Sequence, residues 1–359
     1  MALDFKSLLS RKSQPLLGLD ISSGSIKLVE LSANGKNLRL ERYAIEPLPK
    51  GVMVDGNIGN MDSASEVVSR AVKKLGSRNK NVALAMPSAQ VITKRIFLPA
   101  GLTEDEYETQ VESEASQYIP FALEEVSLDF QVLGPSATSP DDVEVLIAAS
   151  RWDKVEDRVA LAEAAGLKPM VMDVDSYAVR SVIDRLAQQM PSQGQDKLIA
   201  VFNIGANTTN LSVFLNAQNV YVREQPFGGA QLTQDIARSY GMSFEEADAR
   251  KRSGDLPENY QRDLLQPFVE NAISEIVRGL QFFFTSTPYG KVDTILLAGG
   301  SAVLEGLADA AANRTQVQTS VINPFKGMAL GSSIREKQLA IDAPGLLTGA
   351  GLAMRRFEA

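Results

Sequence analysis

The residue types most suited to chemistry gather in residues 16–31, which read LLGLDISSGSIKLVEL. Short apolar residues lead to Asp20, and the turn Ser22-Ser23-Gly24-Ser25 separates them from a returning strand that carries Lys27. Apolar runs broken by a Ser/Gly cluster predict a hairpin that brings one carboxylate to a hydroxyl-lined loop. Backbone N–H groups in such a turn can bind phosphate oxygens, and the serine hydroxyls and the lysine ammonium add donors. The stretch therefore predicts a site for an anionic, metal-bound ligand, with an ordinary exposed hairpin as the alternative.

The same pattern returns at residues 199–214, IAVFNIGANTTNLSVF, where Asn203 takes the place of Asp20. A third strand is predicted after each hairpin, at residues 37–46 and 219–225. The first of these follows an Asn-Gly pair, the strongest two-residue signal for a hairpin turn. Two copies of one three-stranded meander predict a duplicated fold.

The composition limits the chemistry that is available. The chain has 359 residues, of which 44% are hydrophobic, enough for large cores in two or more domains. It contains no cysteine or histidine, which excludes disulfides, thiolate nucleophiles, Ser-His-Asp triads and the usual zinc sites. The net charge of -8 argues against a nucleic-acid-binding protein, because such a protein needs a basic surface. Chemistry by Asp, Glu, Lys, Ser and Thr with a hard metal remains, as in Mg²⁺-nucleotide sites.

Elements in the first half must position the first hairpin. Strands at 82–86 and 91–98 are expected to extend its sheet. The pattern Thr103-x-x-Glu106 is a capping box at the start of an acidic helix. Helix, strand, strand, helix and strand over residues 103–173 then predict a compact inserted subdomain.

Two glycine-rich turns in the second half could approach a ligand. Gly228-Gly229 leads into a helix, where it can admit a phosphate to backbone N–H groups or serve merely as a turn. A buried strand at 292–298 ends in Gly299-Gly300-Ser301. A helix over 303–312 is expected to begin at that turn and to seat an adenosine or phosphate group.

These motifs resemble those of actin-like ATPases. Residues 19–24 (LDISSG) and 203–209 (NIGANTT) are similar to the two phosphate motifs of that superfamily, and residues 297–301 (LAGGS) are similar to its adenosine motif. The superfamily includes actin, Hsp70, sugar kinases and FtsA. The resemblance implies an α/β, ribonuclease H-like, duplicated two-lobed fold that holds ATP with Mg²⁺, and an inserted FtsA-type α+β subdomain. Within the superfamily, the whole chain to its closing GLLTGAGLAMRRF most resembles the PilM family of type IV pilus assembly proteins.

The resemblance also implies a role for each candidate residue. Asp20 would organise hydrated Mg²⁺, while Asn203 stands where most members keep an Asp, so ATP binding with weak or absent hydrolysis is expected. No catalytic residue is assigned. The other expected nucleotide-binding residues are Ser22, Ser23, Gly24, Ser25, Lys27, Gly205, Asn207, Thr208, Thr209, Gly228, Gly229, Gly299, Gly300, Ser301 and the pair Asp248 and Lys251. For that last pair, a solvated salt bridge on a helix is the alternative.

A cytoplasmic scaffold for pilus biogenesis and twitching motility is the function that this family implies. Its members bind the short N-terminal cytoplasmic tail of the inner-membrane protein PilN in a groove beside the inserted subdomain, and they are linked to the pilus motor ATPases. No stretch approaches the roughly 18 consecutive apolar residues of a transmembrane helix, so contact with the inner membrane is expected to be indirect. Self-association of the protein is also compatible with this resemblance. An FtsA-like cytoskeletal polymer and a small-molecule kinase are the alternatives.

The expected domain bounds follow the same resemblance. They are a flexible N-terminus at 1–14, the first lobe core at 15–101, the inserted subdomain at 102–167, a return to the first lobe at 168–190, the second lobe core at 191–235, its helical subdomain at 236–290, the second lobe core again at 291–340, and a C-terminal helix packing on the first lobe at 341–359.

Overall fold

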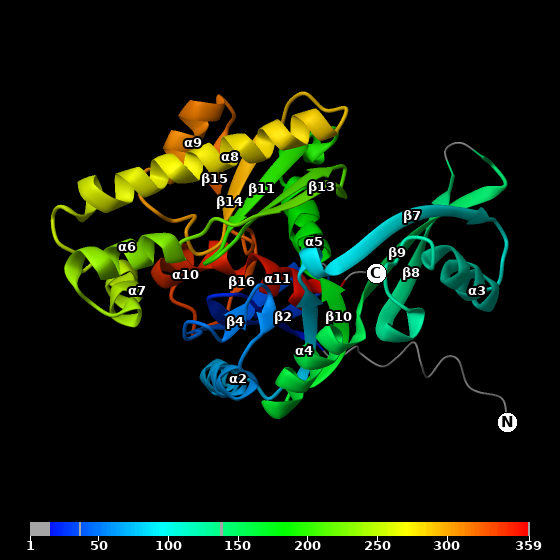
Figure 1. Ribbon diagram of the computed structural model, residues 1–359, viewed down its shortest axis with the longest axis horizontal. Helices are drawn as coiled ribbons and strands as arrows, with labels where there is room; N and C mark the ends of the chain where they lie inside the picture. Colours follow the sequence, from blue (N-terminus) through cyan, green and yellow to red (C-terminus); the bar gives the residue numbers. More distant parts are fainter. Residues whose placement is uncertain (1–14, 36, 137–138, 358–359) are drawn as a thin grey trace.

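The computed structural model describes residues 15–35, 37–136 and 139–357, so the expected flexible segment 1–14 lies outside the described residues. Two β-sheets form the centre of the molecule, and each contains one of the predicted meanders (Figure 1). The first sheet has the order β10-β6-β1-β2-β3-β16. Its strands are β1 (Leu17–Ile21), β2 (Ser25–Asn34), β3 (Asn37–Pro47), β6 (Asn81–Met86), β10 (Lys168–Val174) and β16 (Ala329–Leu330).

The second sheet repeats this plan in the order β13-β12-β11-β14-β15. Its strands are β11 (Leu198–Ile204), β12 (Thr209–Leu215), β13 (Gln218–Gln225), β14 (Thr294–Ala298) and β15 (Thr319–Val321). In both sheets the first strand pairs antiparallel with the second strand of the meander and parallel with a later strand. The predicted duplication is therefore present in the pairing of the strands.

Helices cover both faces of each sheet. The α-helices are α2 (Met61–Leu75), α3 (Glu104–Ala115), α4 (Trp152–Ala164), α5 (Asp175–Ala187), α6 (Ala230–Tyr240), α7 (Phe244–Ser253), α8 (Gln266–Ser286), α9 (Leu307–Thr315), α10 (Glu336–Asp342) and α11 (Leu347–Met354). Shorter elements are β4 (Met53–Val54), β5 (Asn57–Ile58), η1 (Ser88–Gln90), η2 (Leu123–Glu125), η3 (Pro191–Gly194), η4 (Gln261–Leu265) and η5 (Ala343–Leu346).

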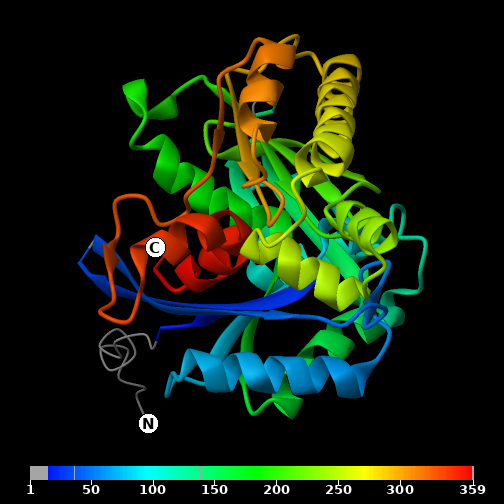
Figure 2. The ribbon, with the colours of Figure 1, turned by 90° about the vertical axis from the view of Figure 1, so that its left-hand side faces the viewer.

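Three large apolar cores and one small one hold the two sheets and their helices together. Side chains of α5 and α11 share the central core with both sheets. On the outer face of the first sheet, α2 and part of α4 complete a second core, and Figure 2 shows α2 beneath the strands. On the outer face of the second sheet, α6, α8 and α9 complete a third. The two sheets therefore form two lobes that meet across α5 and α11.

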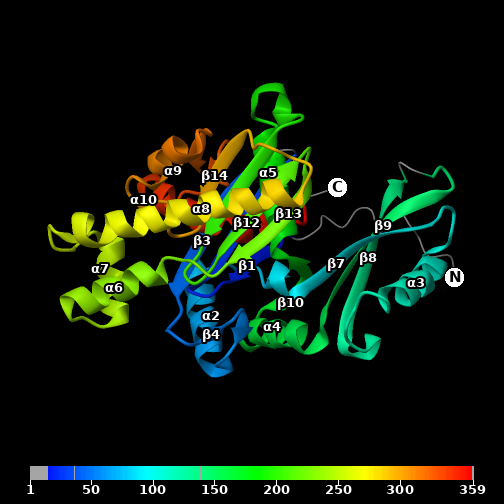
Figure 3. The ribbon, with the colours of Figure 1, turned by 45° about the horizontal axis from the view of Figure 1, so that its top comes forward.

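The strand expected at 91–98 exists, but its expected place in the first sheet is wrong. It forms β7 (Val91–Pro99), which pairs antiparallel with β9 (Asp142–Arg151), and β9 also pairs with β8 (Val126–Pro135). With α3 these strands enclose a separate apolar core, and Figures 1 and 3 show the unit projecting from one side of the two lobes. Leu161 and Ala162 of α4 instead lie in the first lobe's core. We therefore propose that the inserted unit spans residues 91–151; the other expected bounds stay predictions.

The structure confirms one predicted helix start and corrects another. Thr103 caps α3 as predicted, because Glu106 N–H donates to the Thr103 hydroxyl and the Glu106 carboxylate accepts from Thr103 N–H at 2.8 Å. The helix expected over 303–312 begins only at Leu307. Gly306 precedes it with a φ of 78°, and turns occupy the residues between Gly299 and that point.

Within the described ranges, every helix is too short or too polar to cross a bilayer.

Candidate functional site

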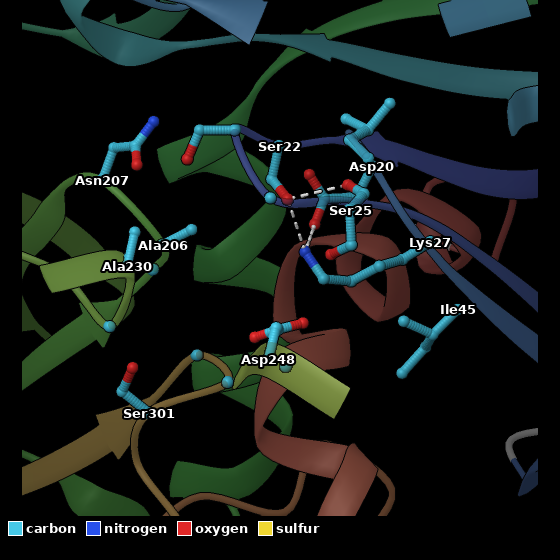
Figure 4. Close-up of a pocket in the computed structure, with 18 of the residues that line it drawn as sticks. Asp20, Ser22, Ser25, Lys27, Ile45, Ala206, Asn207, Ala230, Asp248 and Ser301 are labelled. Carbon is cyan, nitrogen blue, oxygen red and sulfur yellow. Dashed lines mark hydrogen bonds and ion pairs between the residues drawn. The ribbon is translucent and has the colours of Figure 1, made fainter. Parts of the chain in front are cut away.

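A cavity of about 2270 Å³ lies between the two lobes and brings most of the predicted site residues together. Both hairpin turns, the Gly-Gly turn after β14 and α7 contribute to its wall, as the close-up in Figure 4 shows in part. The predicted residues that line it are Asp20, Ser22, Ser23, Gly24, Ser25, Lys27, Asn203, Gly205, Asn207, Thr208, Gly229, Asp248, Lys251, Gly299, Gly300 and Ser301.

The first hairpin holds an ion pair at the cavity wall. Asp20 on β1 stands opposite Lys27 on β2, and the Lys27 Nζ lies 2.9 Å from the Asp20 carboxylate. The same ammonium donates to the Ser22 hydroxyl at 2.9 Å, and that hydroxyl donates to the carbonyl oxygen of Ser25 at 2.8 Å (Figure 4). Both charged side chains are about seven-eighths buried, at 13% and 14% exposure. The Lys27 ammonium thus neutralises the Asp20 carboxylate. A positively charged ligand would have to share this carboxylate with Lys27 or displace the ammonium from it.

The tips of the two hairpins touch across the cavity. A Cβ atom built on Gly24 would lie 2.6 Å from the Cβ of Ala206, closer than side-chain carbons approach. Any side chain at position 24 would therefore push the two turns apart. The second tip is closed by a hydrogen bond of 2.9 Å from Gly205 N–H to the carbonyl oxygen of Thr208.

Asn203 occupies the position in the second lobe that Asp20 occupies in the first. Its side-chain oxygen faces the Gly299 backbone, where a Cβ atom would lie 2.7 Å away. Gly299 has a φ of 87°, which favours glycine, so the close approach and the backbone conformation both require this residue type. The first glycine of the predicted adenosine motif therefore packs against the end of β11.

Two predicted residues do not line the cavity, which corrects their expected roles. Thr209 is 1% exposed, and its hydroxyl donates to the carbonyl oxygen of Phe227 at 2.8 Å. Gly228 packs on the hairpin tip, because a Cβ atom there would lie 2.3 Å from the carbonyl oxygen of Ala206. Both residues lie between the strand and the tip, so they support the hairpin turn.

The start of α6 is also less available than its glycines suggest. The N–H groups of Gly229 and Ala230 donate to the carbonyl oxygens of Gly205 and Ala206 at 2.9 and 2.8 Å. These two donors are therefore engaged by the protein. Gly229 still borders the cavity, but its N–H does not point at a ligand.

Asp248 and Lys251 form the salt bridge of the alternative interpretation, but their side chains are only 22% and 17% exposed, so the pair is not a solvated one, and its role in nucleotide binding stays a prediction. They form an ion pair of 3.2 Å within α7, and both line the cavity. Lys251 also donates to the Gly229 carbonyl at 3.4 Å and to the Thr233 hydroxyl. Burial lowers the pKa of the Lys251 ammonium. The pair thus joins α7 to α6 at the cavity wall.

Sequence reasoning missed Asp175, which lies at the start of α5 and lines the cavity. Its carboxylate accepts from Ser88 N–H at 3.0 Å and from the Ser88 hydroxyl. Burial raises the pKa of the Asp175 carboxyl to about 6, and the nearby charge of Asp20 acts in the same direction. A usable signal existed, because Asp175 directly follows a strand parallel to β6, and the carboxyl ends of parallel strands commonly meet at a site.

Arg158 on α4 is the second missed residue, and it is only 3% exposed. Its guanidinium donates to the carbonyl oxygens of Ile21 and Gly56 at 3.4 and 3.0 Å. Burial lowers the pKa of this guanidinium, whereas the charges of Asp175 and Asp20 oppose that shift. No local pattern in the sequence marks an arginine in a helix as a buried one.

A second, small cavity of about 20 Å³ is bordered by Asp175 and Asn203. Asn210, Ser88 and Thr348 also line it, and this volume is sufficient for one water molecule with several polar partners. Among the described residues, no group of three or more acidic side chains could hold a metal by itself. The acidic and amide oxygens at this end of the cavity therefore suit a hydrated ion better than a fully protein-bound one.

Asp175→Asn is expected to stabilise the protein at neutral pH. Since the Asp175 pKa is about 6 in the folded state and 3.8 in the reference, its stabilising contribution is full below pH 4 and lost as the pH rises through 6. The isosteric amide can accept from Ser88 without a buried charge, so unfolding at pH 7.5 should cost about 1–3 kcal/mol more than in wild type. Urea titrations at pH 4 and 7.5 measure this.

The exposed Asp141 supplies the matched control, since Asp141→Asn also replaces one carboxylate by an amide but leaves the contact with Ser88 in place. A less stable Asp175→Asn protein at pH 7.5 would show that the charged carboxylate is needed to hold Ser88.

Comparisons with known proteins agree over almost the whole chain. The family model described as "Type IV pilus assembly protein PilM" matches residues 18–357. A solved structure of a "PilM-PilN type IV pilus biogenesis complex" contains a chain of 28% identity with a TM-score of 0.79, covering 97% of this chain and 100% of that one.

More distant similarities concern the fold alone. The ethanolamine utilization protein EutJ from Carboxydothermus hydrogenoformans has 15% identity and a TM-score of 0.54, with 95% of this chain and 90% of that one covered. MreB5 of Spiroplasma citri, solved bound to ADP, has 14% identity and a TM-score of 0.50, with 94% and 95% covered. These similarities confirm the expected two-lobed, actin-like α/β fold.

Proposed function

The chain belongs to the PilM family of type IV pilus assembly proteins, and from that premise we propose that it is an ATP-binding scaffold of the pilus assembly complex. The observation that carries the proposal is the contact between the two hairpin tips across the interlobe cavity. A ligand with several phosphates would contact turns from both lobes at once. Its binding would therefore set how the lobes are arranged.

The phosphate end of the ligand is proposed to lie between the two turns. Serine hydroxyls and Lys27 are the donors of the first lobe, and Asn207 and Thr208 belong to the second. The nucleoside would extend toward Gly299-Gly300-Ser301 and the Asp248–Lys251 pair. At about 2270 Å³ the cavity exceeds the roughly 300–1,000 Å³ of most small-molecule pockets, so an ATP molecule fits with space to spare.

Magnesium is proposed to accompany the nucleotide. Asp20, Asn203 and Asp175 border the same end of the cavity and offer the oxygen atoms that Mg²⁺ prefers, partly through water. Bound Mg²⁺ would neutralise phosphate charge. Asp20 would then share its charge with the metal instead of with Lys27 alone.

Hydrolysis is proposed to be slow because Asn203 is neutral. Its amide can bond a water in the small cavity shared with Asp175, but a charge-assisted bond is roughly twice as strong. In the ligand-free protein this neutrality has a benefit, since a third carboxylate beside Asp20 and Asp175 would be costly to ionise. The site is thus better arranged to keep ATP than to turn it over.

The proposed partner is the cytoplasmic tail of a PilN-like protein of the inner membrane. The family and the solved PilM-PilN complex support this, and the inserted unit is the proposed docking region. Phe97 on β7 is 56% exposed, and exposed aromatic side chains commonly anchor protein partners. The protein would remain cytoplasmic and reach the membrane, and the pilus motor ATPases, through such contacts.

Mg·ATP should raise the melting temperature, since a ligand that binds only the folded cavity stabilises by mass action. Gly300→Glu should abolish the rise, because it places a negative charge at the cavity wall. A Cβ atom at Gly300 meets nothing within 4 Å, so the substitution should leave the fold intact. Gly290→Glu is the matched control, as position 290 is equally open and lies away from the cavity. Equal ATP shifts in both variants would refute the site.

Asn203→Asp should increase ATP hydrolysis by about tenfold or more, because it restores a charged group beside the water site. Single-turnover phosphate release from wild type and variant is the measurement, with Asp20→Ala to reveal contaminating ATPase. Rapid wild-type turnover that Asp20→Ala abolishes would favour an enzyme over a scaffold. An unchanged rate in Asn203→Asp would show that other water-positioning groups are missing.

The protein should sediment with membranes only when its bitopic partner carries a cytoplasmic tail. Phe97→Glu should reduce that fraction by removing an apolar anchor, whereas Val321→Glu, on the second lobe and 38% exposed, should not. Fractionation of cells with and without the tail tests both statements. Membrane association that persists without the tail would indicate direct lipid binding.

A further inference from the structure

The inserted unit behaves structurally as a separate body with two joints to the first lobe. Its core consists of residues from within 92–149, and the central and first-lobe cores share none of them. One joint is η1, which leads into β7, and the other is the direct passage from β9 to α4 at Arg151 and Trp152. Its orientation therefore depends on how these joints are held.

The first joint is held by a residue of the candidate site. Ser88, the first residue of η1, donates its N–H at 3.0 Å and its hydroxyl to the Asp175 carboxylate. Ser88 borders only the small cavity, while Asp175 borders both. A change in the charge or position of that carboxylate would act directly on η1.

The second joint is linked to the candidate site through Arg158. This guanidinium, on the helix that follows β9, bonds the carbonyl oxygen of Ile21, the residue after Asp20. It is attracted by both Asp175 and Asp20. The joints are also bonded to each other, because the Ser150 hydroxyl donates to the Gln90 carbonyl at 2.9 Å.

We propose that Ser88 and Arg158 couple nucleotide occupancy of the cavity to the orientation of the inserted unit. The inference rests on the proposed function and adds a route for its regulation. Nucleotide with its cation would interact with Asp175, which holds the first joint, and with Asp20, whose neighbour Ile21 accepts the hydrogen bond from Arg158 at the second joint. Ser88 and Arg158 are positioning residues here, since their effect passes through other groups.

The coupling is reciprocal by thermodynamic necessity. If nucleotide favours one orientation of the inserted unit, a peptide that binds only that orientation strengthens nucleotide binding by the same factor. Binding of a partner tail to the inserted unit would thus change the nucleotide affinity of the cavity, although the two ligands make no contact with each other.

Spin labels can measure the orientation directly, because the chain has no native cysteine. Glu108→Cys on α3 and Ser69→Cys on α2 place one exposed label on each body. Mg·AMPPNP should shift the mean distance between the labels by roughly 2 Å or more. Ser88→Ala should remove at least half of that shift while nucleotide affinity, measured by calorimetry, changes by less than about threefold.

Ser116→Ala is the matched control, since it also removes one hydroxyl hydrogen bond, in this case to the Ser113 carbonyl, which lies within the inserted unit and away from both joints. It should keep the full shift. Arg158→Lys, which retains the charge but not the two-carbonyl geometry, should reduce the shift as Ser88→Ala does. It provides a second route if one variant is too unstable to use.

The outcomes separate the two proposals. Nucleotide binding without a distance change, or an equal change in wild type, Ser88→Ala and Arg158→Lys, would overturn the coupling and leave ATP binding intact. Failure of wild type to bind nucleotide would overturn the proposed function and the coupling with it.

Discussion

The fold depends on one close contact, the packing of α11 against β1 and α5. All eight residues of this helix are buried. A Cβ atom on Gly18 would lie 2.0 Å from the carbonyl oxygen of Gly349, and a Cβ atom on Gly351 would lie 1.9 Å from that of Ala178. Only glycine permits backbone contact on both sides of the helix. The close packing of α11 lets its side chains share one apolar core with both sheets.

The charges at that cavity are balanced within the protein. Asp20 is paired with Lys27, while Asp175 is held by Ser88 and faces the buried Arg158. Burying a charge without such partners is costly, so each of these charged groups is paired in the ligand-free protein. A bound ligand would replace some of these partners. Asp175 through Ser88, and Arg158 through the Ile21 carbonyl, also hold the joints of the inserted unit. Ligand binding and partner binding would thereby draw on one set of electrostatic contacts.

The sequence by itself determined the parts of the site that depend on short-range signals. Alternating apolar residues and turn formers located both hairpins, and these placed Asp20 and Asn203 at equivalent strand ends. The strand ending in Gly299 and the capping box at Thr103 were equally local. Such features follow from backbone preferences and hydrogen bonds within a few residues, so no knowledge of distant contacts is needed. The overall actin-like fold came from a resemblance carried by these same motifs.

Only the tertiary structure decided which segments meet. The pattern of β7 specifies a strand but not its partner, because the free edges of two sheets satisfy the same alternation. The N–H groups at Gly229 and Ala230 look available in sequence, yet the hairpin tip of their own lobe engages them. Asp175 and Arg158 acquire their roles from burial beside Asp20, a residue more than 130 positions earlier in the chain (158 minus 20 is 138). Burial and charge proximity are properties of the folded chain, and no local pattern encodes them.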